Sequence, residues 1–389
     1  MKEKTKLIHA GREVPTNEGT VNQPVYRAST ILSTDMVSYL NRHAGQRRYN
    51  NVTYGATGTQ NAKTLGAAVA ALEEGYKCIV TASGLSAVTL GISALVQSGD
   101  HMLVTDSVYG PTRRFCSDVM KRYGVETTYY TPGLDPTELA ALIRPETKLI
   151  YLEAPGSLTF EMQDIPGLAA VAKARGVLTA MDNTWATPLG FKPLQHGVDV
   201  SIQAGTKYLA GHSDLVIGML SASDPGVYER VADHVMTFGD VAGPDDCYLT
   251  LRGMRTLAVR LRAQFDAALE IAQWLEQQPE VKRVMYPPLA SDPGHEWFAR
   301  DFRLGASLFG VALHTTDQSR LESMVNGFEL FHIGSSWGGY ESLVAVNLMP
   351  LPRDCVPWTD SPFLLRFHIG LEDPSDLKHD LRQALDRLS

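Results

Sequence analysis

Residues 177–214 read VLTAMDNTWATPLGFKPLQHGVDVSIQAGTKYLAGHSD, and this stretch decides the fold class. Two short apolar runs within it, at 177–181 and 199–203, have the length of buried strands. Asp182 follows the first run and Lys207 follows the second. The carboxyl ends of parallel strands meet at one edge of an open sheet, where such folds bind ligands. We therefore expect Asp182 and Lys207 at the same sheet edge.

The chain before this stretch shows the same alternation of strands and helices. We predict strands at 78–80, 102–105, 126–130, 148–152, 177–181 and 199–203, with a helix at 62–72 before the first strand and helices at 85–96, 112–123, 136–143 and 167–174 between the later ones. Strands that alternate with helices at this spacing form a mostly parallel sheet with helices on both faces. The predicted fold class is therefore α/β.

The sequence pattern divides the chain into three parts. Residues 1–60 form an irregular arm with little periodicity, and an arm of this length is expected to contact a neighbouring subunit. Residues 61–245 form the main domain. Residues 246–389 begin with an amphipathic stretch at 248–277 and then mix strand-like runs with helices, which predicts a smaller C-terminal α+β domain.

Composition limits the classes of partner. The chain has 389 residues, of which 44% are hydrophobic, and a formal net charge of -8. That acidic balance argues against a nucleic-acid surface. Four scattered cysteines fit reduced thiols, and neither a signal-peptide core nor a membrane-spanning apolar run is evident. We expect a cytoplasmic protein with no nucleic-acid or membrane partner.

Lys207 carries the chemical interpretation. Burial readily lowers the pKa of a lysine amine, which suits a nucleophile that forms a Schiff base. Taken alone, Lys207 is more often an ordinary loop lysine, and Asp182 is as often a turn or capping residue. Together they indicate pyridoxal phosphate (PLP), because a carboxylate beside the ring nitrogen keeps that nitrogen protonated and the ring electron-withdrawing.

A strand–turn–helix junction at 81–87, TASGLSA, adds a phosphate site. Free backbone N–H groups and the helix dipole at such a junction favour a phosphate, and Gly84 permits close approach of the backbone. Tyr109 follows the next strand and is placed to stack on the ring, although a half-buried core tyrosine is the commoner fate. No P-loop, dinucleotide or zinc-protease motif is present, and no metal site is expected.

These residues resemble the Cys/Met-metabolism PLP-dependent enzymes of fold type I. The resemblance spans Thr30 to the C-terminus and is carried by Gly205–Asp214, Ser83–Leu85, Asp182–Thr184 and Arg366–Glu372. Within the family, Trp185 and the runs at 153–157 (EAPGS) and 336–342 (SWGGYES) are most similar to the bacterial cystathionine β-lyase branch.

The resemblance implies a role for each matching position. The cofactor-binding residues implied are Lys207, Asp182, Gly84, Leu85, Tyr109, Thr206 and Tyr54. Lys207 forms the Schiff base and moves protons, and Tyr109 assists it. Arg366 clamps the α-carboxylate of the substrate in a bidentate geometry, with Ser336 and Trp337 beside it. Tyr54 reaches the phosphate of a neighbouring subunit, which makes a dimer the active unit, normally within a tetramer.

Two positions depart from the family pattern. The family has Tyr-x-Arg at the arm, where this chain has Ala56 in place of the arginine. A charged hydrogen bond to phosphate is worth roughly 1.5–3 kcal/mol, so we expect weaker PLP binding unless Arg47, Arg48 or Lys63, which lie nearby in the sequence, replaces the arginine. Ser335 stands where lyases of this branch carry an aromatic residue at the border of the substrate pocket.

The predicted activity is a PLP-dependent carbon–sulfur β-lyase. It would convert L-cystathionine, or a related cysteine thioether, to a thiol such as homocysteine, with pyruvate and ammonia. Ala56 and Ser335 leave open an amino-acid racemase or a lyase of another cysteine derivative. A PLP-binding interaction protein without catalysis is the alternative from another class.

Overall fold

The computed structural model describes residues 1–11, 19–45, 47–348 and 351–388. Seven strands form the main sheet: β1 (Lys77–Thr81), β2 (His101–Thr105), β3 (Glu126–Tyr130), β4 (Thr147–Glu153), β5 (Leu178–Asp182), β6 (Val200–Gln203) and β7 (Gly218–Ala222). Their order across the sheet is β1-β7-β6-β5-β4-β2-β3. Strands β6, β5, β4, β2 and β3 are parallel, so the predicted α/β class is confirmed.

Strand β7 was not predicted. It pairs antiparallel with both β1 and β6, between which it lies. Its sequence, GMLSA, has only two large apolar side chains, although the whole strand is buried. The apolar pattern is weak because glycine, serine and alanine face close neighbours: a Cβ on Gly218 would lie 2.1 Å from the carbonyl oxygen of Ser83.

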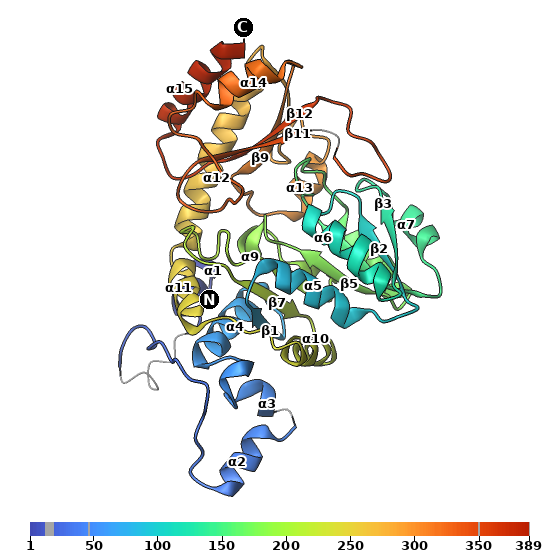
Figure 1. Ribbon diagram of the computed structural model, residues 1–389, viewed down its shortest axis with the longest axis vertical. Coiled ribbons are helices and arrows are strands. Elements are labelled where there is room, and N and C mark those ends of the chain that lie inside the picture. The colour runs from blue at the N-terminus through green and yellow to red at the C-terminus, as the bar shows by residue number, and fades with distance from the viewer. Residues whose placement is uncertain (12–18, 46, 349–350, 389) are drawn as a thin grey trace.

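Helices cover both faces of the main sheet (Figure 1). They are α4 (Gln60–Glu73), α5 (Gly84–Leu95), α6 (Gly110–Arg114), η3 (Phe115–Met120), α7 (Pro136–Leu142), α8 (Ile165–Ala174), α9 (Thr187–Gly190), η4 (Pro193–His196) and α10 (Pro225–Thr237). Alternate residues of β4 enter opposite cores: Leu149 packs on the α5 side, and Ile150 on the α4 and α8 side. Burial on both faces explains why these strands read as continuous apolar runs.

A second, smaller sheet follows. Its strands are β8 (Val281–Met285), β9 (Leu308–Leu313), β10 (His332–Ile333), β11 (Leu343–Leu348) and β12 (Phe363–His368), in the order β10-β11-β12-β9-β8. Its helices include α12 (Leu257–Leu275), α13 (His295–Asp301), α14 (Gln318–Val325), α15 (Pro374–Leu385) and η5 (Asp386–Leu388). The amphipathic stretch predicted at 248–277 is two helices, because α11 (Pro244–Met254) ends before α12 begins.

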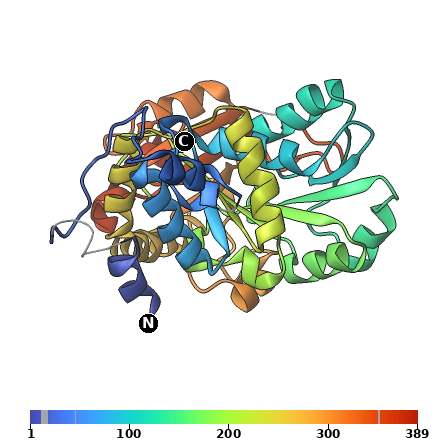
Figure 2. The same cartoon turned by 90° about the horizontal axis from the view of Figure 1, so that it is seen from below.

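The N-terminal arm is less irregular than the sequence predicted. It contains α1 (Glu3–His9), α2 (Met36–His43), α3 (Arg47–Asn50) and η2 (Gly55–Thr57), while residues 12–18 and 46 lie outside the described part. The Asp35 carboxylate caps α2 by accepting the Ser38 N–H at 2.7 Å. Helix α2 has no buried residue and projects away from the body of the chain in Figure 1, and Figure 2 shows the molecule from the end at which α2 lies.

Candidate active site

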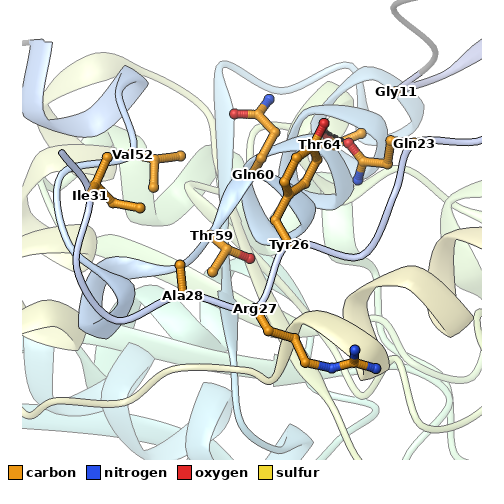
Figure 3. A pocket seen from close by; sticks show the side chains of 10 residues that line it. All are labelled: Gly11, Gln23, Tyr26, Arg27, Ala28, Ile31, Val52, Thr59, Gln60 and Thr64. Carbon is orange, nitrogen blue, oxygen red and sulfur yellow. Dashed lines mark hydrogen bonds between the residues drawn. The ribbon is translucent and has the colours of Figure 1, made fainter. Parts of the chain in front are cut away.

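A cavity of about 280 Å³ lies where the carboxyl ends of β4, β5 and β6 face the small sheet. Residues of both sheets line it, including Ser83, Gly84, Leu85, Tyr109, Glu153, Asp182, Trp185, Thr206, Lys207, Ser335, Trp337 and Arg366. The structure thus brings together the predicted cofactor and substrate residues of the two sheets with the exception of Tyr54, and Ser336 contacts Lys207. A larger hollow of about 560 Å³ beside the arm has no lysine or carboxylate in its lining (Figure 3).

Lys207 lies in the turn after β6, with its amine inside the cavity. Its Nζ donates to Ser336 Oγ at 2.7 Å and lies 5.1 Å from the centre of the Trp337 ring. Burial, reinforced by the positive charge of Arg366, lowers the pKa of Lys207 to about 8, although Asp182 opposes the shift. A substantial fraction of the amine is therefore neutral near physiological pH, as a nucleophile or base requires.

Asp182 is the last residue of β5, where the parallel sheet brings it to the same edge as Lys207. Burial raises the pKa of its carboxyl, while hydrogen bonds from Thr184 and the charge of Lys207 oppose that shift. The Thr184 N–H donates to Asp182 Oδ1 at 3.0 Å, which fixes the carboxylate. A carboxylate in such surroundings is stabilised by a cation, and a protonated pyridine nitrogen fits that need.

The N-terminus of α5 forms the cradle predicted for a phosphate. Ser83 Oγ accepts the Ser86 N–H at 3.0 Å, whereas the N–H groups of Gly84 and Leu85 donate to no acceptor in the described chain. A Cβ on Gly84 would lie 2.5 Å from Ala204 Cβ, so glycine lets the helix begin close to the Lys207 turn. Two unpaired N–H groups at the start of a 12-residue helix fit an anion.

Two carboxylates beside the cavity were missed as site residues. Asp240 accepts the Ala82 N–H at 2.7 Å and pairs with the Ser86 hydroxyl, so it braces the α5 junction. Glu153 accepts the Tyr109 N–H at 2.9 Å and lies beside Asp182 on the neighbouring strand. Burial and the nearby Asp182 charge raise the pKa of Glu153 well above its ordinary value. Neither contact has a local sequence signal, because each partner lies more than forty positions away.

Tyr109 lines the cavity rather than the core. Its side chain is partly exposed, and burial together with the charge of Asp182 raises the pKa of its hydroxyl. The phenol therefore remains protonated near neutral pH. The expected alternative, a half-buried core tyrosine, does not describe this residue.

The small sheet supplies Arg366, from β12, to the cavity. Its Nη2 donates to the carbonyl oxygen of Ser335 at 2.8 Å, and no carboxylate of the described chain pairs with the guanidinium. A half-buried arginine with donors to spare fits the carboxylate of an amino acid. Trp185 closes the cavity between the sheets by donating its indole N–H to Leu308 O at 2.9 Å.

The arm residues of one chain do not join this cavity. Tyr54 and Ala56 are exposed, and neither is among the lining residues. Of the three cations considered as replacements at the phosphate, Arg48 pairs with Asp233 at 2.7 Å and Arg47 donates to Asn41 at 3.0 Å. Lys63 donates to the carbonyl oxygen of Tyr49 at 3.3 Å and pairs with no carboxylate of the described residues. The role of Tyr54 at a neighbouring subunit stays a prediction.

Two kinds of feature are absent from the residues that the structure describes. No helix there is long and apolar enough to cross a membrane. No group of three or more His, Cys, Asp or Glu side chains is arranged there to hold a metal ion.

Comparisons with known proteins agree with the geometry. A family model described as Cys/Met metabolism PLP-dependent enzyme matches residues 4–386. A cystathionine β-lyase of Haemophilus influenzae is 37% identical over 392 residues, covering 99% of this chain and 98% of the relative. An L-alanine/L-glutamate racemase of Wolbachia pipientis is 38% identical over 398 residues, covering 100% and 98%. The crystal structure of cystathionine γ-synthase from Xanthomonas oryzae in complex with cystathionine has a TM-score of 0.90 and 30% identity, covering 100% and 98%.

Proposed function

The chain belongs to the Cys/Met metabolism PLP-dependent enzymes, and on that premise we propose that it is a carbon–sulfur β-lyase. The predicted family and its cofactor, PLP, are thereby confirmed. The substrate proposed is L-cystathionine or a related cysteine thioether, and the products are a thiol, pyruvate and ammonia. The observation that carries the proposal is the Lys207 amine, which shares one cavity with the Asp182 carboxylate and with the guanidinium of Arg366, and that guanidinium pairs with no carboxylate of the described chain.

Some residues of the cavity would bind the cofactor, and others bind the substrate. When bound, PLP withdraws electrons from the substrate Cα and so stabilises negative charge there. Asp182 would hold the ring nitrogen, and the N–H groups of Gly84 and Leu85, with Thr206, would hold the phosphate. Arg366 binds the α-carboxylate and thereby sets where Cα lies.

Proton movement falls to Lys207 and Tyr109. The neutral amine of Lys207 removes the Cα proton, because a base with a pKa near the working pH transfers protons most effectively. Ser336 accepts a hydrogen bond from that amine and so directs it. The protonated Tyr109 hydroxyl provides a second donor at the cavity wall. The electrons of the broken Cα–H bond then form a Cα–Cβ double bond while the Cβ–S bond breaks and releases the thiolate. Water hydrolyses the remaining dehydroamino acid to pyruvate and ammonia.

A racemase is the second candidate, favoured by the full-length similarity to the Wolbachia racemase. Racemisation needs a proton removed and returned, and both Lys207 and Tyr109 line the cavity. In that case the Cβ substituent would stay attached.

One assay separates the candidates. Purified holoenzyme is given L-cystathionine and, separately, L-alanine, and pyruvate, 2-oxobutyrate and D-alanine are measured. Pyruvate as the main product supports β-elimination. Dominant 2-oxobutyrate indicates γ-elimination and contradicts the proposal, and D-alanine without pyruvate favours the racemase.

We also propose that the arm, residues 1–60, packs on a neighbouring copy of the chain, with 61–245 as the PLP-binding domain and 246–389 as the C-terminal domain. Four large apolar residues of α2 are each more than half exposed: Met36, Val37, Tyr39 and Leu40. A monomer rarely leaves such a group uncovered. Packing of the arm would also carry Tyr54 to the neighbour's phosphate site, in a dimer that pairs into a tetramer.

The assembly is tested by the mass of the particle in solution. The double substitution Met36→Ser and Leu40→Ser should shift the protein to smaller species, while Tyr123→Ser, at an exposed site of the main domain, should not. A monomeric wild-type enzyme would contradict the proposal. Four free cysteines in the described chain are consistent with the cytoplasmic location that we propose.

A further inference from the structure

The turn at residues 335–339 is where the small domain touches Lys207. Ser336 accepts the hydrogen bond of the lysine amine, and the carbonyl oxygen of Ser335 accepts one from Arg366. Gly338 has a φ of +89°, and a Cβ there would lie 2.8 Å from the carbonyl carbon of Lys207. The position of this turn therefore sets how the lysine and the carboxylate-binding arginine lie relative to each other.

His368 lies directly behind the turn. It follows Arg366 by two positions on β12 and is 1% exposed. The Gly338 N–H donates to His368 Nε2 at 3.2 Å, and the carbonyl oxygen of Gly339 lies 3.2 Å from the same nitrogen. Gln264, on α12, donates its amide N–H to that carbonyl at 2.6 Å.

These contacts determine the protonation of the ring. Because the Gly338 N–H points at Nε2, a proton on that nitrogen would collide with it, so Nε2 must be the acceptor. The Gly339 carbonyl does not need a donor from His368, since Gln264 supplies one. The proton then resides on Nδ1, which lies 3.1 Å from Ser307 Oγ. Burial lowers the pKa of His368 to about 3 against the opposing effect of the Gly339 carbonyl, and the charges of Arg366 and Lys207 add to the lowering, so the ring is neutral.

The other side of the ring connects back to the Lys207 turn. The Ser307 N–H donates to the hydroxyl oxygen of Tyr208 at 3.0 Å, and the two hydroxyl oxygens are 3.1 Å apart. Tyr208 is the residue after Lys207, and its ring centre lies 5.4 Å from that of Trp337. A buried hydrogen-bonded path thus joins the turn of the small domain to the backbone that carries the lysine.

We propose that His368 is a positioning residue, which holds the 335–339 turn against Lys207 through its Nε2 acceptor and is itself oriented by Ser307. It acts through Ser336 and Arg366 and does not line the cavity. Loss of the acceptor leaves the Gly338 N–H buried without a partner, which favours movement of the turn. The inference rests on the proposed function only in its use of an amino-acid substrate.

Two substitutions of similar size test the acceptor. The amide oxygen of His368→Gln can reach the place of Nε2, whereas the shorter side chain of His368→Asn replaces only the Nδ1 end. We expect His368→Asn to lower kcat/KM for L-cystathionine by about tenfold or more, because a buried donor is left unpaired. His368→Gln should stay within about threefold of wild type.

Two further readouts on the holoenzyme do not require turnover. Glycine, which has no Cβ to eliminate, is titrated by the change in cofactor absorbance, and its affinity should fall about tenfold in His368→Asn only. The pH titration of the same absorbance should shift in His368→Asn and return towards wild type in His368→Gln. If His368 only stabilised the fold, a folded variant would change neither the affinity for glycine nor the pH titration of the cofactor absorbance. PLP content and thermal unfolding confirm that each variant is folded and loaded.

Three outcomes would overturn the proposal. Equal losses of activity in the Asn and Gln variants would show that the Nε2 acceptor is unimportant. Wild-type activity of both variants would show that the imidazole ring itself is unimportant. If the Asn variant does not fold, the nitrogen-15 spectrum of wild-type His368 decides, because a proton on Nε2 contradicts the network. Failure of wild-type enzyme to cleave L-cystathionine would instead refute the proposed function, and the glycine and spectral readouts would still test His368.

Discussion

The two halves of the cavity are built differently. On the main-sheet side, Asp182 and Lys207 follow adjacent parallel strands, so the backbone pairing of β5 and β6 fixes them. On the small-sheet side, Arg366 and the 335–339 turn are held by hydrogen bonds between side chains and distant backbone groups. The difference assigns cofactor chemistry to the rigid half and substrate recognition to the half whose placement depends on long-range contacts.

The loop after β11 adds further long-range contacts that hold the small domain against the main domain. The carboxylate of Asp106, just after β2, accepts the N–H groups of Asp354 and Cys355 at 3.0 Å each and pairs with the buried Arg113. Arg353 in the same loop pairs with Glu161 at 2.6 Å. Polar contacts therefore fasten the loop after β11 to the main domain close to Tyr109.

The largest effect is expected in the rigid half, from Lys207→Ala. Removing the base alone should lower kcat by about 10²- to 10⁴-fold, and the protein should lose its borohydride-reducible adduct with PLP. Lys148→Ala is the control, because that exposed lysine lies outside the cavity. A Lys207→Ala enzyme that kept both the adduct and its turnover would refute the assignment.

Arg366→Ala should weaken substrate binding on the small-sheet side of the cavity and leave cofactor binding unchanged. The loss of a charged hydrogen-bonded clamp, worth about 1.5–3 kcal/mol, should raise KM about 10- to 150-fold. PLP content should not change, because Arg366 holds no part of the proposed cofactor site. Steady-state kinetics and cofactor absorbance measure the two quantities. Arg262→Ala, at an exposed pair with Asp266, is the control, and loss of PLP from the Arg366 variant would contradict the division between halves.

The same division explains what the sequence could predict. Short apolar runs that alternate with helical segments locate β4, β5 and β6. The geometry of a parallel sheet then places Asp182 and Lys207 together without any knowledge of the loops. The ends of the six predicted strands of the main sheet differ from the observed ends by at most one residue. Strand β7, which lacks a strong apolar pattern, was missed.

Contacts between distant segments had no such signal. Asp106 and Asp354 are 248 positions apart, and nothing in the sequence near either residue indicates the other. Arg366 and Ser336 were identified through the family resemblance alone, and His368 was not recognised as part of the site. Periodicity reports which face of an element is buried, whereas pairing of polar side chains across domains depends on the complete fold.

Asp106→Asn should loosen the small-domain half without touching the cavity. An amide offers one acceptor oxygen where the carboxylate offers two, so either Asp354 or Cys355 faces an NH₂ group, and Arg113 keeps only one of its two carboxylate partners in the described chain, Asp354. We expect a loss of about 1–3 kcal/mol in the free energy of unfolding, measured by denaturant titration. Asp118→Asn, at an exposed aspartate nearby, should be neutral.

The pH dependence of stability provides the check on that substitution. Burial raises the pKa of Asp106, but the N–H groups of Asp354 and Cys355 and the charge of Arg113 outweigh it, so the pKa is lowered from 3.8. A carboxylate with a lowered pKa contributes stability that is complete above its ordinary pKa and is lost as the pH falls through the lowered value. Wild type and variant should therefore converge in acid. A difference that persisted below that range would mean that Asp106 does not act through its charge.

The smallest expected effect is that of the Arg366 charge, on the small-sheet side of the cavity, on the pKa of Lys207, on the main-sheet side. In cofactor-free protein, Lys207 reacts with added PLP as the neutral amine, so with a pKa of about 8 the rate should rise through that pH and then level off, rather than rise towards 10.5. Burial is the larger cause of the shift, and the charge of Arg366 adds to it. Arg366→Ala should therefore move the plateau to higher pH by less than the full distance to 10.5, whereas Arg262→Ala should leave it in place. Stopped-flow absorbance gives the rate at each pH. If Arg366→Ala does not move the plateau, the small domain has no charge effect on the lysine, and its influence is confined to the Ser336 hydrogen bond and the turn behind it.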